Sequence, residues 1–239
     1  MFQRGYLQQA AASFEQVIAA KPDEPEAYYN LGTLYLRQND LPNARRYLEQ
    51  TVKLHASHPE AWNNLGMIAA QEGHAEEAVQ DFQTSLQYRP DYATALVNLG
   101  NVYRRQGDSA DAEKLLSHAL EIEPENPEAN YGMGMLYARQ DDLEQAAKYL
   151  QQAVSLRPDY TDALNNLGVL FVREKQYDQA KAQFASCIRV DPNFDQAYLN
   201  LARLYVIVDD KPKAREVLQA LLKNQPQNKL AQQALEVLR

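Results

Sequence analysis

A glycine that recurs every 34 residues is the feature that most limits how this chain can fold. When the sequence is aligned on the short motif Asn-Leu-Gly, the interval is kept without insertion or deletion, and Ala202 continues the series. The aligned glycines are Gly32, Gly66, Gly100, Gly134 and Gly168. An unbroken period of about 20–50 residues predicts stacked structural repeats instead of one globular core.

Six full repeats result when Pro25 is taken as position 1 of a repeat. The predicted segments are a partial repeat with a second helix (1–24), six full repeats (25–58, 59–92, 93–126, 127–160, 161–194 and 195–228) and a capping or next-repeat helix (229–239). Position 20 is alanine, and position 24 is phenylalanine or leucine, in all seven segments that contain them. Position 32 is proline except at Ala56.

Each repeat is expected to hold two helices, because apolar residues recur with helical spacing at positions 3, 7, 10 and 14 and again at 20, 24, 27 and 28. Small residues at positions 8 and 20 predict a close approach of the two helices. Position 15 is expected to end the first helix in a left-handed conformation, which Gly5, Asn39, Gly73, Gly107 and Asp141 tolerate and for which Lys175 and Asp209 are less usual. A polar residue at position 33 is expected to cap the next first helix.

These residues resemble the tetratricopeptide repeat family over the whole chain. The resemblance rests on a large residue at position 4, leucine at 7, glycine at 8, an aromatic residue at 11, alanine at 20 and proline at 32. Asn130 at position 4 and Ala69 at position 11 depart from the pattern. The resemblance implies an all-α, right-handed superhelical solenoid of antiparallel helix pairs, in which the first helices line a concave groove.

Composition limits the classes of partner. The chain is 45% hydrophobic and 23% charged, and its formal net charge is −8, which is typical of an ordered, soluble protein. The acidic balance argues against nucleic acid and against an anionic membrane surface. The sequence has neither an apolar run long enough for a membrane-spanning helix nor a signal-peptide pattern, and it leaves the localisation open.

The residues of the first helix that are not needed for packing fall on positions 2, 5, 6, 9, 12 and 13, which share one face of a helical wheel. Position 6 forms a row of asparagines: Asn30, Asn64, Asn98, Asn166 and Asn200. Position 13 forms a row of arginines: Arg37, Arg105, Arg139 and Arg173. Further candidates for ligand binding at positions 5 and 9 are Tyr29, Asn63, Tyr131, Asn165 and Asn101. Position 2 is acidic in four of six repeats.

The asparagine row is interpreted as a peptide-binding element, since an amide offers two donors and an acceptor to an extended backbone. The row is similar to the asparagine ladder in the repeat region of O-GlcNAc transferase, although no transferase sequence is present. An alternative is that the amides link neighbouring first helices. The charged rows have their own alternative, because acids in the first turn and arginines in the last turn suit the helix dipole.

No catalytic, metal or cofactor site is predicted. The four histidines do not form a zinc-binding set, and the only cysteine, Cys187, occupies an interior position of the repeat. The predicted function is a protein-interaction scaffold that binds a peptide or partner segment in the groove. Two alternatives remain: a recognition module of a larger enzyme such as a glycosyltransferase, and a scaffold that self-associates through the incomplete N-terminal repeat.

Overall fold

A computed structural model describes the backbone of residues 2–238 and the side chains of residues 7–238. Met1, the first residue of the predicted segment 1–24, and Arg239, the last residue of the predicted segment 229–239, lie outside the described residues. The chain divides into two compact units, Met1–Pro124 and Glu125–Arg239. Fourteen helices and no strand are found in the part of the chain that is described.

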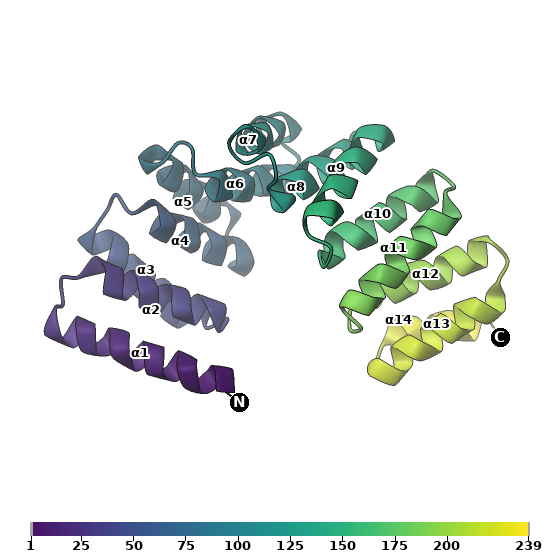
Figure 1. The fold of residues 1–239 in the computed structure, drawn as a ribbon, viewed down its shortest axis with the longest axis horizontal. Coiled ribbons are helices and arrows are strands. Elements are labelled where there is room, and N and C mark those ends of the chain that lie inside the picture. Colours follow the sequence, from purple (N-terminus) through teal and green to yellow (C-terminus); the bar gives the residue numbers. More distant parts are fainter. Residues whose placement is uncertain (1, 239) are drawn as a thin grey trace. The chain divides into compact units, whose positions relative to one another are not determined.

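The first unit contains helices α1 to α7, and each connects to the next by a short turn (Figure 1). Their bounds are α1 (Phe2–Ala20), α2 (Pro25–Arg37), α3 (Leu41–Leu54), α4 (Pro59–Glu72), α5 (Ala75–Tyr88), α6 (Ala93–Gln106) and α7 (Ser109–Ile122). Helix A denotes the first helix of a repeat, and helix B denotes the second.

The second unit contains helices α8 to α14 (Figure 1). Their bounds are α8 (Pro127–Arg139), α9 (Leu143–Leu156), α10 (Thr161–Arg173), α11 (Tyr177–Val190), α12 (Asp195–Ile207), α13 (Lys211–Asn224) and α14 (Lys229–Val237). Helix A of each full repeat packs most extensively on its own helix B, as α2 does on α3 and α8 on α9. Within each unit, helix B also packs on helix A of the next repeat, as α3 does on α4 and α9 on α10. The predicted all-α array of helix pairs is confirmed.

The core of each helix pair is built from the residues whose repetition defines the period. The alanines at position 20 from Ala44 onward are fully buried, and the leucines and phenylalanines at position 24 of the same repeats are at most 1% exposed. A Cβ atom added to Gly168 would lie 2.6 Å from the ring of Phe184, and one added to Gly134 would lie 2.8 Å from Leu150. At these two positions helix B approaches helix A too closely for a side chain to fit without a shift, which explains the glycines.

The turns inside the repeats use left-handed residues, as the sequence indicated. Gly73 and Gly107 have positive φ angles of 84° and 94°. Asn39, Asp141, Lys175 and Asp209 have φ between 58° and 66°, so even the lysine adopts the conformation that normally favours glycine or asparagine.

Two local expectations differ from the structure. Gly5 lies inside α1, which runs from Phe2 to Ala20, and does not end a helix. The residue that caps helix A is at position 34, one place later than expected: the side chains of Asn126 and Asn228 accept from the backbone N–H groups of Ala129 and Ala231. Position 34 is preferred because the cap must reach the N–H three residues ahead, and helix A begins directly after it.

The lengths and compositions of the helices show whether any of them could span a membrane. None of the described helices combines the length and the apolar content that a membrane span requires.

Candidate functional site

The predicted binding residues lie on the A-helix face, which is the surface formed by positions 2, 5, 6, 9, 12 and 13 of helices α2, α4 and α6 in the first unit and of α8, α10 and α12 in the second. The residues differ in exposure along this face. Asn30 and the four arginines (Arg37, Arg105, Arg139 and Arg173) are exposed or partly exposed; Tyr29, Asn64, Asn98, Asn101, Tyr131 and Asn166 are half-buried; Asn63, Asn165 and Asn200 are buried. The arginines and Asn30 are therefore the most accessible members of the predicted set.

The asparagines at position 6 form hydrogen bonds between neighbouring A helices, which are called amide links here. Asn98 Nδ2 donates to Asn63 Oδ1 of the preceding helix A at 2.9 Å, and Asn200 Nδ2 donates to Asn165 Oδ1 at 2.9 Å. In both cases position 6 of one repeat meets position 5 of the repeat before it. The buried asparagines at position 5 thus serve as acceptors that hold neighbouring repeats together.

Two further amide links use hydroxyl acceptors. Asn166 Nδ2 donates to the hydroxyl of Tyr131 at 3.0 Å, and Asn64 Nδ2 donates to Thr33 Oγ1 at 3.4 Å. Each link uses one of the two N–H donors of the asparagine, so a second donor remains for another partner. The carbonyls of Asn64 and Asn200 also accept, from Asn63 and Gln196 of the same helices. Of the two roles that the sequence left open for the row, the link between A helices is observed.

A second kind of link joins position 13 to the turn residue at position 15 of the preceding repeat. Gln71 Nε2 donates to Asn39 Oδ1 at 2.8 Å, and Arg173 forms an ion pair with Asp141. Arg105 faces a repeat whose turn residue is Gly73, and its Nε donates instead to the backbone carbonyl of Asn101. A small pocket of about 240 Å³ lies at this place, lined by Ala70, Gly73, Ala75, Val102, Arg105 and Gln106.

Two of the four carboxylates at position 2 are paired with arginines of their own repeats. Glu60 forms an ion pair with Arg89 at 2.5 Å, and Glu128 forms one with Arg157. Burial alone would raise the pKa of Glu60, but hydrogen bonds from its backbone and from Arg89 hold that pKa below its usual value. These acids are neutralised by arginines at position 31, a column that the repeat pattern did not single out.

The aromatic residues at position 34 lie under the same arginines. The Arg89 guanidinium lies 5.0 Å from the ring centre of Tyr92, and that of Arg157 lies 4.7 Å from Tyr160. Tyr160 in turn contacts the predicted binding residue Tyr131, with ring centres 5.0 Å apart. These contacts stabilise the start of helix A and orient the Tyr131 hydroxyl that accepts the amide link.

His58 occupies position 34 of the first full repeat. It was not identified from the sequence as a residue of the site. It is 6% exposed, its Nδ1 accepts from the backbone N–H of Ala61, and Glu26 and Glu60 approach its two ring nitrogens. The predicted binding residue Tyr29 packs against the imidazole ring of His58, with ring centres 4.5 Å apart. Across the described residues, no group of three or more His, Cys, Asp and Glu side chains is placed to hold a metal ion.

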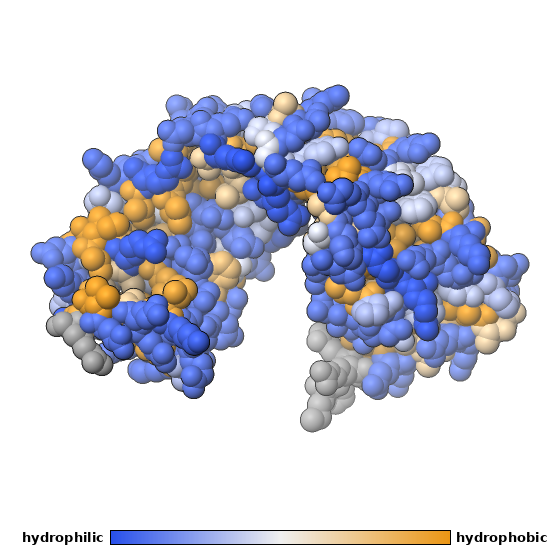
Figure 2. Space-filling model, turned by 180° about the vertical axis from the view of Figure 1, so that it is seen from behind, coloured by the Kyte–Doolittle hydropathy of each residue, from blue (hydrophilic) through white to orange (hydrophobic). Residues whose placement is uncertain are grey.

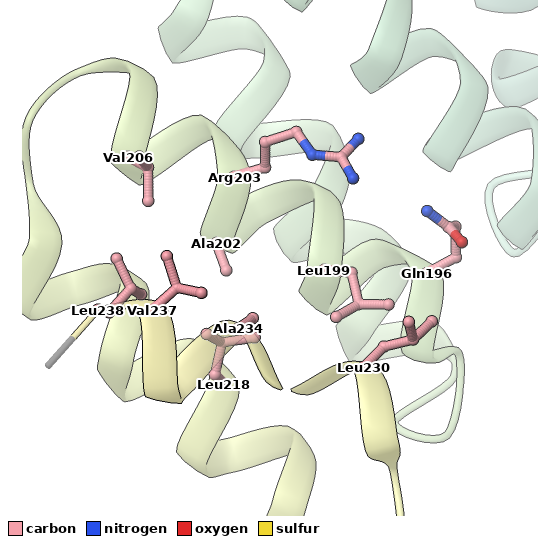
Figure 3. Close-up of a pocket in the computed structure, with 10 residues that line it drawn as sticks. All are labelled: Gln196, Leu199, Ala202, Arg203, Val206, Leu218, Leu230, Ala234, Val237 and Leu238. Carbon is pink, nitrogen blue, oxygen red and sulfur yellow. The ribbon is translucent and has the colours of Figure 1, made fainter. Parts of the chain in front are cut away.

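A larger pocket of about 400 Å³ lies between α12 and α14 in the second unit (Figure 3). Its lining is mostly aliphatic: Leu199, Ala202, Val206, Leu218, Leu230, Ala234, Val237 and Leu238, with Gln196 and Arg203. Figure 2 shows apolar surface at this end of the second unit. None of these residues belongs to the predicted site, because that site was drawn from the rows that recur and this pocket forms where they stop.

Helix A and helix B of each repeat, their packing on the next repeat and the polar links between A helices define a helical repeat protein. The chain belongs to the tetratricopeptide repeat family. Models described as tetratricopeptide repeat match residues 58–125, residues 97–161 with 131–180, and residues 1–68 with 171–238. No curated protein sequence matches the chain.

Solved structures with the same fold include three that illustrate its range. The chain in the crystal structure of the APC/C hetero-tetramer Cut9–Hcn1 is 18% identical with a TM-score of 0.87; the match covers 98% of this chain and 46% of that one, so this chain spans about half its length. PilW, a type IV pilus biogenesis factor, is 21% identical with a TM-score of 0.79 and coverage of 88% and 98%. YrrB, described as having an unusual peptide-binding site, is 25% identical with a TM-score of 0.58 and coverage of 79% and 97%. The tetratricopeptide fold is generally a protein-interaction module, and most such proteins are non-catalytic.

Proposed function

We propose that this chain is a protein-interaction scaffold that binds an extended peptide or partner segment along the A-helix face within a unit. The supporting observation is the hydrogen-bonding capacity that remains there after the amide links are made. Asn98 and Asn166 each retain one N–H donor and a carbonyl, and Asn30 makes no side-chain hydrogen bond with any described residue. An extended chain needs alternating donors and acceptors, which a row of amides can supply.

The arginines give this face a preference for partners with acidic residues. Among the described residues, Arg37 forms no ion pair and Arg105 bonds only a backbone carbonyl. A guanidinium retains several donors after one such bond and binds carboxylates in a two-pronged geometry. Two of the four carboxylates at position 2, Glu60 and Glu128, are already paired with Arg89 and Arg157 and leave these arginines uncompensated.

The proposal keeps part of the likeness to the asparagine ladder of O-GlcNAc transferase. The shared feature is the row of amides at one position of helix A. In this chain the amides also join neighbouring A helices, so each asparagine would both hold the face in shape and contact a bound segment. The proposal assigns no reaction to the chain, and it needs no cofactor.

A selection from a random-sequence peptide library, followed by affinity measurements on the selected peptides, tests the proposal. The test variant combines five changes on the A-helix face: Asn30→Ala, Arg37→Ala, Arg105→Ala, Arg139→Ala and Asn166→Ala. The matched control removes three charges and two amides from exposed positions of the B helices: Lys53→Ala, Lys114→Ala, Lys223→Ala, Gln80→Ala and Gln151→Ala. Circular dichroism checks that both variants keep the helical content of the wild type.

Selected peptides are expected to bind the test variant at least about tenfold more weakly, which corresponds to a loss of about 1.4 kcal/mol. This is a modest expectation, because a hydrogen bond to a charged group contributes about 1.5–3 kcal/mol. The control variant is expected to bind like the wild type. Equal affinity in the test variant and the wild type, or failure to select any peptide, would contradict the proposal.

A further inference from the structure

The pocket between α12 and α14 lies where the amide link is missing. In the preceding pair of A helices, Asn200 at position 6 of α12 bonds Asn165 at position 5 of α10. The corresponding residues of the next pair are Leu199 in α12 and Ala234 in α14, and both line the pocket. Neither side chain can form the link, and alanine is too short to fill the space. The interval between the helices therefore stays open down to Leu218 of α13.

The shape and chemistry of the pocket favour a helix as its occupant. The lining residues of α12, from Gln196 to Val206, extend over about 15 Å of helix. An extended segment buried here would leave backbone N–H and C=O groups unpaired against aliphatic walls, which is costly. A helix satisfies its own backbone and would present only side chains to Leu199, Val206 and Leu230.

Arg203 at the edge of the pocket adds a preference for charge. Among the described residues it has no hydrogen bond or ion pair, and it is exposed. Figure 3 shows the guanidinium of Arg203 and the amide of Gln196 on one side, with the apolar side chains of α12 and α14 beside them. The Gln196 amide is held in place, because its Nε2 donates to Asn200 Oδ1 at 3.1 Å, and Asn200 bonds Asn165.

We propose that this pocket binds the apolar stripe of an amphipathic helix from a partner protein, and that Arg203 pairs with an acidic residue beside that stripe. The inference rests on the proposed function, since it assigns a partner class to one end of the A-helix face. The inference differs from the proposed function in the bound segment. The amide-lined part of the face suits an extended chain, whereas the pocket suits a helix. Three leucines at helical spacing would extend over about 10 Å and fit the length of the pocket.

Synthetic helical peptides with an alanine–glutamine background are the probes. The first carries three leucines at positions i, i+4 and i+7 with glutamates beside them; the second has lysines in place of the glutamates. A third replaces the leucines by glutamine, and a fourth equals the first with a proline in the centre. Fluorescence anisotropy at low salt, where exposed charges are least screened, measures their affinities.

The first peptide is expected to bind at least about tenfold more tightly than each of the other three, through leucine burial, the pairing with Arg203 and the helical backbone. Arg203→Glu is expected to invert the order of the glutamate and lysine peptides. Lys223→Glu, the same charge change at an exposed position of α13 outside the pocket lining, is expected to leave the order unchanged. The double variant Leu199→Asn, Ala234→Asn, which supplies the missing amide link, is expected to abolish binding while the helical content is kept.

Three results would overturn the inference. They are equal binding of the glutamate and lysine peptides, an order that Arg203→Glu does not change, and undiminished binding of the proline peptide. Sedimentation of the protein alone tests a second copy as the occupant: self-association that the double variant abolishes would also overturn it. The peptide-library test does not change any pocket residue. A loss of library binding in the five-residue variant together with indifference to these probes would refute the helix pocket and leave the proposed function standing.

Discussion

The glycines at position 8 do not all tolerate a side chain equally. A Cβ atom on Gly100 would meet Leu116 Cγ at 3.0 Å, whereas one on Gly168 would meet the Phe184 ring at 2.6 Å. Both neighbours are fully buried, but the contact at Gly100 needs only a small shift of the leucine, whereas the shorter contact at Gly168 would have to displace a rigid ring. The same substitution should therefore have different effects in the two repeats.

We expect Gly168→Ala to lower the free energy of unfolding by about 1–3 kcal/mol through overpacking. Gly100→Ala should change it by less than about 1 kcal/mol, because the gain in helix propensity, about 1 kcal/mol, offsets the milder contact. Urea denaturation followed by circular dichroism measures both values. Equal effects of the two substitutions would show that the phenylalanine ring does not limit the approach of the helices.

Asp81 is a buried acid on α5 and gives a pH-dependent prediction. It is 8% exposed, and burial together with the nearby Glu77 and Glu49 raises its pKa to about 6 against the opposing effect of Arg45. The folded state thus keeps this proton at a pH where the unfolded state has released it. The free energy of unfolding falls as the pH rises from about 4 to about 6, and the loss persists above that range.

Asp81→Asn removes this penalty and nearly preserves the shape of the side chain. The difference in pKa corresponds to at most about 3 kcal/mol, and we expect about 1–2 kcal/mol of added stability at pH 7, since water and mobile acids around the site reduce the effect. At pH 4 the variant and the wild type should be equally stable. Thermal unfolding at a series of pH values checks this, and a stabilisation that does not depend on pH would exclude the proton as its cause.

The amide links make the A helices depend on one another at the scale of secondary-structure elements. Asn165 is 6% exposed and Asn200 is 9% exposed, and their link at 2.9 Å joins α10 to α12. Removal of either side chain leaves a buried amide without its partner, which costs about 1–3 kcal/mol. Removal of both side chains takes away the donor and the acceptor together.

We predict a favourable coupling energy of about 0.5–2 kcal/mol in the double-mutant cycle of Asn165→Ala and Asn200→Ala. The double variant should be less destabilised than the sum of the single variants. Asn30→Ala serves as the control, and it should change stability by less than about 0.5 kcal/mol because this asparagine is exposed. Additive effects in the cycle would mean that the link contributes nothing to the packing of α10 on α12.

The sequence was sufficient to predict the helices, because their signals lie within one repeat. Apolar spacing, the proline at position 32 and the turn residue at position 15 indicated the helix pairs, and even Lys175 adopts the left-handed turn that the register requires. The asparagine row was also visible. The hydrogen bonds of this row could not be predicted, because the acceptor at position 5 belongs to another repeat. A helical wheel of one helix does not show how far the neighbouring helix is shifted along its axis.

The pocket between α12 and α14 was missed for a related reason. It depends on two unremarkable residues in different helices, Leu199 and Ala234, which matter only because the residues at these places normally form a link. The same holds for the smaller pocket at Gly73 and Arg105, where the link to position 15 is absent. A repeat pattern shows which positions recur, whereas pockets form at the exceptions.

The division into two units belongs to the scale of the whole molecule, and the repeat period did not predict it. The register continues unchanged through Pro124, where the units Met1–Pro124 and Glu125–Arg239 meet in sequence. A period reports the geometry inside each repeat and says little about how strongly one repeat holds the next. Each unit nevertheless contains complete helix pairs and a core of its own, formed around Phe82 in the first unit and Phe184 in the second.

We therefore expect each unit to fold when it is produced separately as residues 1–124 or 125–239. In a repeat array stability is approximately the sum of the repeats and their interfaces, so each fragment should be helical and unfold cooperatively, at a lower temperature than the full chain. The control is a cut between α6 and α7, as residues 1–107 and 108–239. This cut separates two helices that pack extensively on each other, so its fragments should lose more helix and melt less cooperatively. Circular dichroism melting of the four fragments distinguishes the cases, and equal behaviour of the two pairs would mean that the boundary at Pro124 has no energetic significance.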